Sequence, residues 1–65
     1  MRETYEYSEH WFKMCRQFNI TIYDIVDFDK MDKFIDDYIQ LNDIDYNFYE
    51  KLHEDRDCKY KELGN

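Results

Sequence analysis

Residues 29–41 read DKMDKFIDDYIQL, and this stretch holds the strongest periodic pattern in the chain. Its apolar side chains recur at steps of three or four residues, at Met31, Phe34, Ile35, Tyr38 and Ile39. That spacing places them on one side of an α-helix, where they can face a core. We therefore predict a helix over residues 30–41, with Asp29 as its N-cap and Asn42 at its end.

Two helices are predicted before this stretch. Ser8 suits the N-cap of a helix over residues 9–18, and Asn19 suits the left-handed position after it. The core-facing side chains of that helix are Trp11, Phe12, Met14, Cys15 and Phe18. Thr21 followed by Asp24 three residues later is a capping-box signature, which favours a short helix over residues 21–27. The β-branched residues of this segment would also suit a strand, but no other segment offers a partner strand, so we favour the helix.

A last helix is predicted over residues 44–63. Its core-facing side chains are Ile44, Phe48, Tyr49 and Leu52. Beyond Leu52 the apolar pattern weakens, and we expect the final turns to be a solvated extension with the i,i+4 ion pairs Asp55/Lys59 and Asp57/Lys61.

Size and composition define the class of fold. The chain has 65 residues with one glycine and no proline, and the gaps between the predicted helices are short. A chain of this length forms one core. We predict a single all-α domain over residues 1–65, a bundle of three to four short helices, with residues 1–7 frayed and residues 64–65 as a tail.

The charge of the chain is strongly negative. Sixteen acids against nine lysines and arginines give a formal charge of −7, which argues against direct binding to nucleic acid or to an anionic membrane. Residues 24–45 carry a net charge of −6, because this segment contains eight aspartates and only two bases, Lys30 and Lys33. Along one helix, that density approaches the phosphate spacing of a nucleic-acid strand.

This acidic segment is the candidate binding site for a basic partner protein. Tyrosines next to acids supply the rigid, amphipathic area that protein interfaces favour. The candidate partner-binding residues are Asp24, Asp27, Asp29, Asp32, Asp36, Asp37, Asp43, Asp45, Tyr23 and Tyr46. Within them, Asp29, Asp32 and Asp36 are expected to form a row on the polar face of their helix. The competing interpretation is that the aspartates are helix caps and a solvated face.

Catalytic and metal-binding motifs are not found. One glycine cannot build a phosphate-binding loop, and we expect no catalytic residue and no cofactor. A calcium-binding loop at residues 43–54 would place Phe48 where glycine is needed. His10 and Cys15 point to different faces of their helix, and so do His53 and Cys58, which argues against zinc. We therefore expect no metal. The chain starts without a secretory signal, which favours a cytoplasmic location. We therefore expect Cys15 and Cys58 to be reduced, although a disulfide between the first and last helices would be sterically possible.

These observations favour a non-enzymatic binding protein. The first hypothesis is an inhibitor of the kind that phages and mobile elements of low-GC bacteria encode, acting in the host cytoplasm by mimicking nucleic acid in a basic groove. The chain has no alanine, which GC-rich codons encode, and many residues with AT-rich codons, which is consistent with that origin. The second is a small bacterial adaptor or regulatory protein that binds through an apolar and tyrosine-rich surface. The third is a homo-oligomeric helical protein of structural role, and a homodimer would use the same surface.

Overall fold

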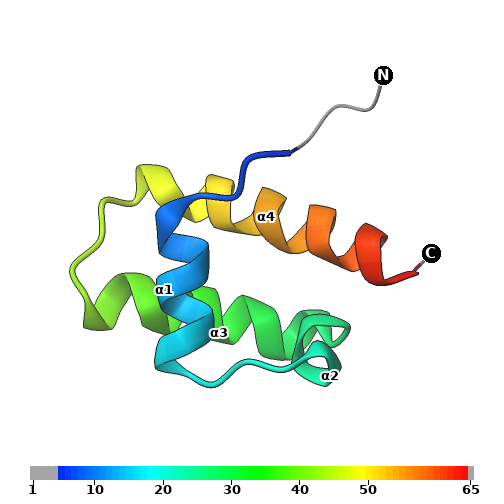
Figure 1. Ribbon diagram of the computed structural model, residues 1–65. Coiled ribbons are helices and arrows are strands. Elements are labelled where there is room, and N and C mark those ends of the chain that lie inside the picture. The colour runs from blue at the N-terminus through cyan, green and yellow to red at the C-terminus, as the bar shows by residue number, and fades with distance from the viewer. Residues whose placement is uncertain (1–4, 65) are drawn as a thin grey trace.

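The computed structural model describes residues 5–64, which form four α-helices and contain no strand (Figure 1). The helices are α1 (Glu9–Gln17), α2 (Ile22–Ile25), α3 (Phe28–Leu41) and α4 (Asn47–Gly64). The predicted all-α class is therefore confirmed, and the segment around Ile22 is helical rather than extended. Asn65 and residues 1–4, part of the predicted tail and fraying segment, lie outside the described residues.

The two longest helices, α3 and α4, pack against each other along the length of the bundle. α3 and α4 run in opposite directions along its length, and α1 crosses both of them (Figure 1). The short α2 contacts both α3 and α4 and lies at the end of the molecule where α3 begins and α4 finishes. The loop of residues 42–46 is at the opposite end.

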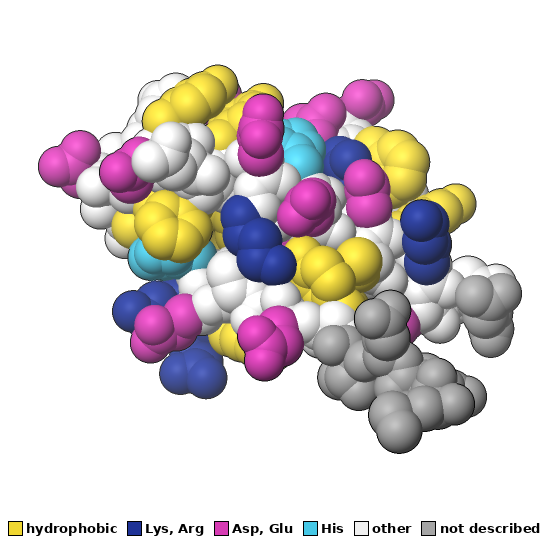
Figure 2. All heavy atoms as spheres, turned by 90° about the horizontal axis from the view of Figure 1, so that it is seen from above, with side chains coloured by type: hydrophobic (Ala, Val, Ile, Leu, Met, Phe, Trp, Pro, Cys, Tyr) yellow, Lys and Arg dark blue, Asp and Glu magenta, His cyan; other side chains and the backbone are white. Residues whose placement is uncertain are grey.

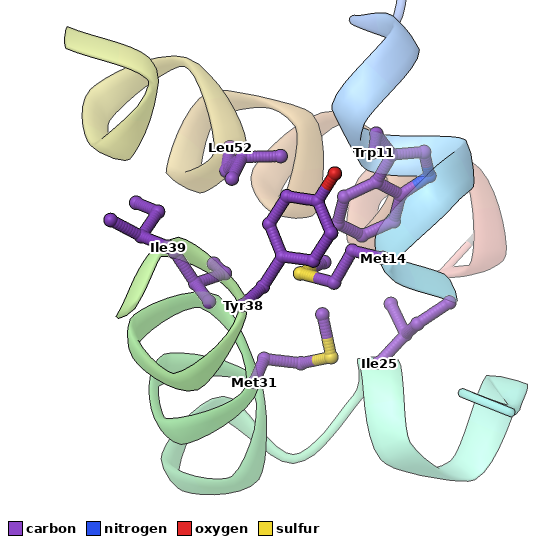
Figure 3. Close-up of a cluster of buried hydrophobic side chains, with 8 residues drawn as sticks. Trp11, Met14, Ile25, Met31, Tyr38, Ile39 and Leu52 are labelled. Carbon is purple, nitrogen blue, oxygen red and sulfur yellow. The ribbon is translucent and has the colours of Figure 1, made fainter. Parts of the chain in front are cut away.

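The core is filled by side chains that point inward from all four helices (Figure 3). The fully buried or nearly buried apolar residues are Trp11, Met14, Ile25, Met31, Ile35, Tyr38, Ile39 and Leu52. The apolar stripe predicted for residues 30–41 is confirmed, since Met31, Ile35, Tyr38 and Ile39 are buried and Phe34 packs against them. Phe12 was expected in this core and is instead 55% exposed, because α1 crosses the bundle at an angle and buries a narrower stripe.

Two helices, α1 and α3, end in the same type of hydrogen-bonded turn. Asn19 has a φ of 52° and the amide of Ile20 donates to the carbonyl of Cys15 at 2.9 Å. Asp43 has a φ of 53° and the amide of Ile44 donates to the carbonyl of Ile39 at 3.0 Å. Both are Schellman motifs, in which a left-handed residue reverses the chain and satisfies the last helical carbonyls. The role predicted for Asn19 is confirmed.

The boundaries of α3 and α4 differ from the predicted ones. α3 begins at Phe28 because the side chain of Asp27, not that of Asp29, caps it, accepting from the amide of Lys30 at 3.3 Å. α4 begins at Asn47 rather than at residue 44, because Asp43 is held in the left-handed turn that ends α3. The helix then starts where Asp45 accepts a hydrogen bond from the amide of Asn47 at 2.9 Å.

The segment before α1 packs along α4. Tyr7 donates a hydrogen bond to Glu62, and Tyr5 donates one to Asp55, so the expected fraying does not describe these two side chains. Asp55 is fully buried, and Leu63 packs against the core. The final turns of α4 thus pack on one side against the N-terminal segment and the core. The predicted solvated extension describes only their exposed residues, which are Tyr60, Lys61, Glu62 and Gly64.

The ion pair predicted between Asp55 and Lys59 is replaced by others. Lys51 reaches Asp55 at 3.4 Å, whereas Lys59 pairs with Glu62 at 3.8 Å. Asp57 pairs with its neighbour Arg56 at 2.8 Å. The i,i+4 spacing alone could not select among these partners, because Asp55 points into the protein.

Candidate protein-binding surface

Half of the eight aspartates of the acidic segment are engaged within the protein. Asp24 completes the capping box with Thr21 and pairs with Lys30 at 3.6 Å, and these contacts, the backbone hydrogen bond from Thr21 first, lower the pKa of its carboxyl. Asp27 and Asp45 cap α3 and α4. The capping interpretation therefore explains these three. Asp32, the fourth, is held by α4.

Asp32 is bound to α4 mainly by an ion pair with Arg56. The guanidinium of Arg56 donates to Asp32 at 2.8 Å and to Asp57 at 2.8 Å, and it lies 4.6 Å from the centre of the Phe28 ring. The imidazole of His53 is 3.5 Å from the same carboxylate of Asp32. Arg56 is therefore a structural link between α3 and α4, and Asp32 is not a free member of the expected aspartate row.

The other aspartates of α3 form what we call the α3 acidic surface: Asp29, Asp36 and Asp37. Asp29 and Asp36 are exposed and Asp37 is half-buried, and none of the three has an ion pair within residues 5–64. Lys33 lies on the same side of the helix by spacing, so this surface has three carboxylates and one ammonium group. Asp43, at the end of α3, is likewise exposed and unpaired among the described residues.

The structure does not bring the two candidate tyrosines together. Tyr23 is on α2 and is 84% exposed, whereas Tyr46 lies just before α4 and is 68% exposed. These elements are at opposite ends of the bundle (Figure 1). The ten predicted residues therefore form no single patch, and the α3 acidic surface lies between two separate exposed tyrosines.

Tyr46 belongs to a ladder of rings along the first turns of α4. It stacks on Tyr49 with a centroid distance of 4.8 Å and an interplanar angle of 6°, and Tyr49 lies 4.5 Å from the ring of His53. Burial, with a smaller contribution from Tyr46, Asp36 and Asp32, raises the pKa of Tyr49. The spacing i, i+3, i+7 of these rings was visible in the sequence, where Tyr49 was assigned to the core.

Exposed apolar side chains gather at the α2 end of the molecule. Ile22 and Val26 are one helical turn apart on and just after α2, and both are about half exposed. Phe28 meets Tyr60 edge to face at 4.9 Å, which connects this end to α4. We call these four residues the α2 apolar patch.

The face of the molecule that α4 occupies has mixed charge. Seen from above, acidic and basic side chains alternate there around apolar patches (Figure 2). The unpaired carboxylates of α3 therefore contrast with an α4 face where bases neutralise neighbouring acids, as Lys51, Arg56 and Lys59 do.

A partly buried polar cluster around Asp55 joins the N-terminal segment to α4, and the sequence pattern did not predict it. Asp55 accepts hydrogen bonds from the hydroxyl groups of Tyr5 and Ser8 and from the amide of Ser8. Lys51 donates to the Tyr5 oxygen at 2.7 Å and to the Glu6 carbonyl at 2.9 Å. Burial is the main cause that raises the pKa of Tyr5, and the bond to Asp55 adds to it. Every member of this cluster is engaged by another, which makes it structural.

Residues 5–64 contain no group of three or more His, Cys, Asp or Glu side chains that could hold a metal ion. None of the helices in this range combines the length and the apolar composition that a membrane-spanning helix needs. Cys15 and Cys58 are both free thiols.

Comparisons with known proteins give no relative from which a role could be transferred. No protein-family model matches the chain, and neither the curated proteins nor the solved structures contain a match to it. The features of the protein that point to a function are the α3 acidic surface and the exposed aromatic side chains.

Proposed function

We propose that this protein is a non-enzymatic binding module whose α3 acidic surface occupies a basic groove of another protein. The observation that carries the proposal is that Asp29, Asp36 and Asp37 remain unpaired on one helix, although the chain has bases that neutralise acids elsewhere. Exposed carboxylates on a short side chain lose little conformational entropy when a lysine or arginine binds them.

The spacing of these acids supports a groove that otherwise holds nucleic acid. Asp29 and Asp36 are seven residues apart, which is about 10.5 Å along a helix. Three phosphate steps of one DNA strand cover about 10.2 Å of the duplex axis. Measured along the two axes, the charge spacing of the α3 acidic surface is therefore similar to that of a phosphate strand. In this proposal the protein is an inhibitor that competes with nucleic acid, of the type encoded by phages or mobile elements and acting in the cytoplasm of the host.

The test is affinity capture from the lysate of a low-GC bacterium, with elution by a salt gradient. The captured protein is then titrated with wild type and with the variant Asp29→Asn/Asp36→Asn/Asp37→Asn. Binding through carboxylates should weaken steeply as ionic strength rises, and the variant should bind at least tenfold more weakly. Excess duplex DNA or RNA should displace wild type from the partner.

A matched variant controls for net charge. Glu6→Gln/Glu9→Gln/Glu54→Gln removes the same number of charges from exposed positions outside α3. It should bind as wild type does, and circular dichroism should show both variants folded. If the two triple variants bind alike, the α3 acidic surface is not the binding site.

The α2 apolar patch favours a second candidate function, an adaptor that binds through apolar area. Such an interface would respond weakly to salt, and Val26→Ser together with Phe28→Ser would abolish it. Binding that survives high salt and is lost in this double variant would select the adaptor over the inhibitor.

A further inference from the structure

A small hollow opens beside the ring ladder at the start of α4. Its volume is about 200 Å³, and it is lined by Tyr46, Asn47 and Glu50. The lining residues therefore bring together an aromatic ring, a carboxamide and a carboxylate. This combination is suited to a planar cation, because the ring attracts positive charge while the two oxygen-bearing groups accept its hydrogen bonds.

The aromatic wall of the hollow is held in place before any ligand arrives. Tyr46 stacks nearly parallel on Tyr49, and Tyr49 in turn contacts His53, so the exposed ring is supported along α4. A rigid ring with two side-chain torsions loses little freedom on binding. The ladder thus explains how a side chain that is 68% exposed can present a fixed surface.

The charge around the hollow is negative. Glu50 is exposed and has no ion pair within residues 5–64. The positive end of α4 is already offset, because Asp45 accepts from the amide of Asn47. Lys51, the nearest base in sequence, is turned to Asp55 and Tyr5. No base in the described chain therefore neutralises Glu50.

We propose that this hollow binds an arginine side chain of the basic partner. Arginine fits better than lysine, since its planar guanidinium can stack on Tyr46 while it donates to Glu50 and to the side-chain oxygen of Asn47. The inference rests on the proposed function, in that it names one contact of the same basic partner. The hollow would anchor one arginine at the α4 end of the molecule while the α3 acidic surface meets the remaining bases.

The experiment is an NMR titration of the whole protein with an octapeptide that contains two arginines among glycines and serines. Two further peptides carry citrulline, the neutral isostere, or lysine in place of arginine. We expect the arginine peptide to shift the signals of Tyr46, Tyr49 and Glu50, the lysine peptide to bind several-fold more weakly, and the citrulline peptide to cause no saturable shift.

Variants locate the contact. Tyr46→Leu and Glu50→Gln should each weaken binding of the arginine peptide about fivefold. Tyr23→Leu, which removes a still more exposed tyrosine at the other end of the bundle, should leave it unchanged. Circular dichroism checks that each variant is folded. Equal affinity for arginine and citrulline peptides, or unchanged affinity in both Tyr46→Leu and Glu50→Gln, would overturn the inference.

The two proposals can fail separately. If the α3 triple variant loses the partner while Tyr46→Leu and Glu50→Gln retain both partner and peptide, the arginine site is wrong and the proposed function stands. If the peptide binds the hollow as expected but the α3 triple variant keeps full affinity for the partner, the arginine site stands and the proposed role of α3 fails.

Discussion

The carboxylate of Asp55 accepts two hydrogen bonds from Ser8, one from its hydroxyl group at 2.9 Å and one from its backbone amide at 3.3 Å. The hydroxyl of Ser8 also accepts from the amide of Trp11 at 3.2 Å and so caps α1. One serine therefore connects the start of α1 to a carboxylate buried on α4.

Asp55→Asn should be strongly destabilising. An asparagine retains one oxygen but turns an NH₂ group toward donors, so a buried hydrogen bond is lost and Lys51 loses its ion pair. We expect the free energy of unfolding to fall by about 2–3 kcal/mol, which lowers the melting temperature by roughly 10–20 °C in a domain of this size. Urea unfolding followed by circular dichroism measures the loss of free energy, and thermal unfolding measures the melting temperature. Asp57→Asn, at an exposed neighbouring carboxylate, is the control and should cost less than about 1 kcal/mol.

Arg56→Lys should loosen the contact between α3 and α4. A lysine cannot bridge two carboxylates and lie flat on Phe28 at the same time, whereas Arg56 does both. The expected loss is about 1–2 kcal/mol in urea unfolding. Lys13→Arg, a change between the same residue types at an exposed pair with Glu9, should alter stability by less than about 0.5 kcal/mol. Equal effects of the two substitutions would show that Arg56 is not a structural link.

Asp43→Gly should stabilise the protein. The residue has a φ of 53°, a left-handed conformation that glycine adopts without steric strain. We expect a gain of about 0.5–1 kcal/mol, measured by thermal unfolding. Asp43→Ala removes the same charge but keeps a β-carbon, so it separates the backbone effect from the electrostatic one. A gain with alanine as large as that with glycine would contradict the argument.

The Cys15 thiol should be unreactive at neutral pH. Burial raises its pKa to about 11 from an ordinary value of 9.0. In a Cys58→Ser background, alkylation of the native protein by iodoacetamide at pH 8 should be about 100-fold slower than in denaturant, because the thiolate is the reactive species. Mass spectrometry follows the rate, which should increase about tenfold per pH unit up to pH 11 if the pKa is correct.

The same shift has a consequence for stability. The unfolded chain releases the Cys15 proton near pH 9, while the folded protein keeps it to about pH 11. The contribution of Cys15 to the free energy of unfolding should therefore be constant below pH 9 and fall between these two values. Cys15→Ala should flatten that part of the pH dependence. A decline of the same size in Cys15→Ala would assign it to other groups.

Much of the fold was predictable because its signals are local. The capping box of Thr21 and Asp24, the left-handed Asn19 and the apolar stripe of residues 30–41 each depend on neighbours a few positions apart. The start of α3 was misplaced because Asp27 and Asp29 are both good N-caps and only the packing of Phe28 distinguishes them. Helix boundaries of this kind are set by tertiary contacts.

The site was less predictable, because it depends on contacts between distant residues. No rule of periodicity places a carboxylate such as Asp55 in a core, and its partners Tyr5 and Ser8 are far away in the sequence. In the same way, the sequence treats Asp32 and Asp36 as equals, whereas Arg56 engages the first and leaves the second to solvent. Which acids are available to a partner could be decided only once α4 was placed beside α3.

The distance along the chain between Ser8 and Asp55 also has a consequence for biosynthesis. These residues are 47 positions apart, so Ser8 is synthesised well before its partner. At usual elongation rates that delay is roughly 2–10 s. During this interval α1 can form its own turns, but the segment before it has no carboxylate to bind. The contacts of the N-terminal segment with α4 are therefore among the last that a newly made chain can complete.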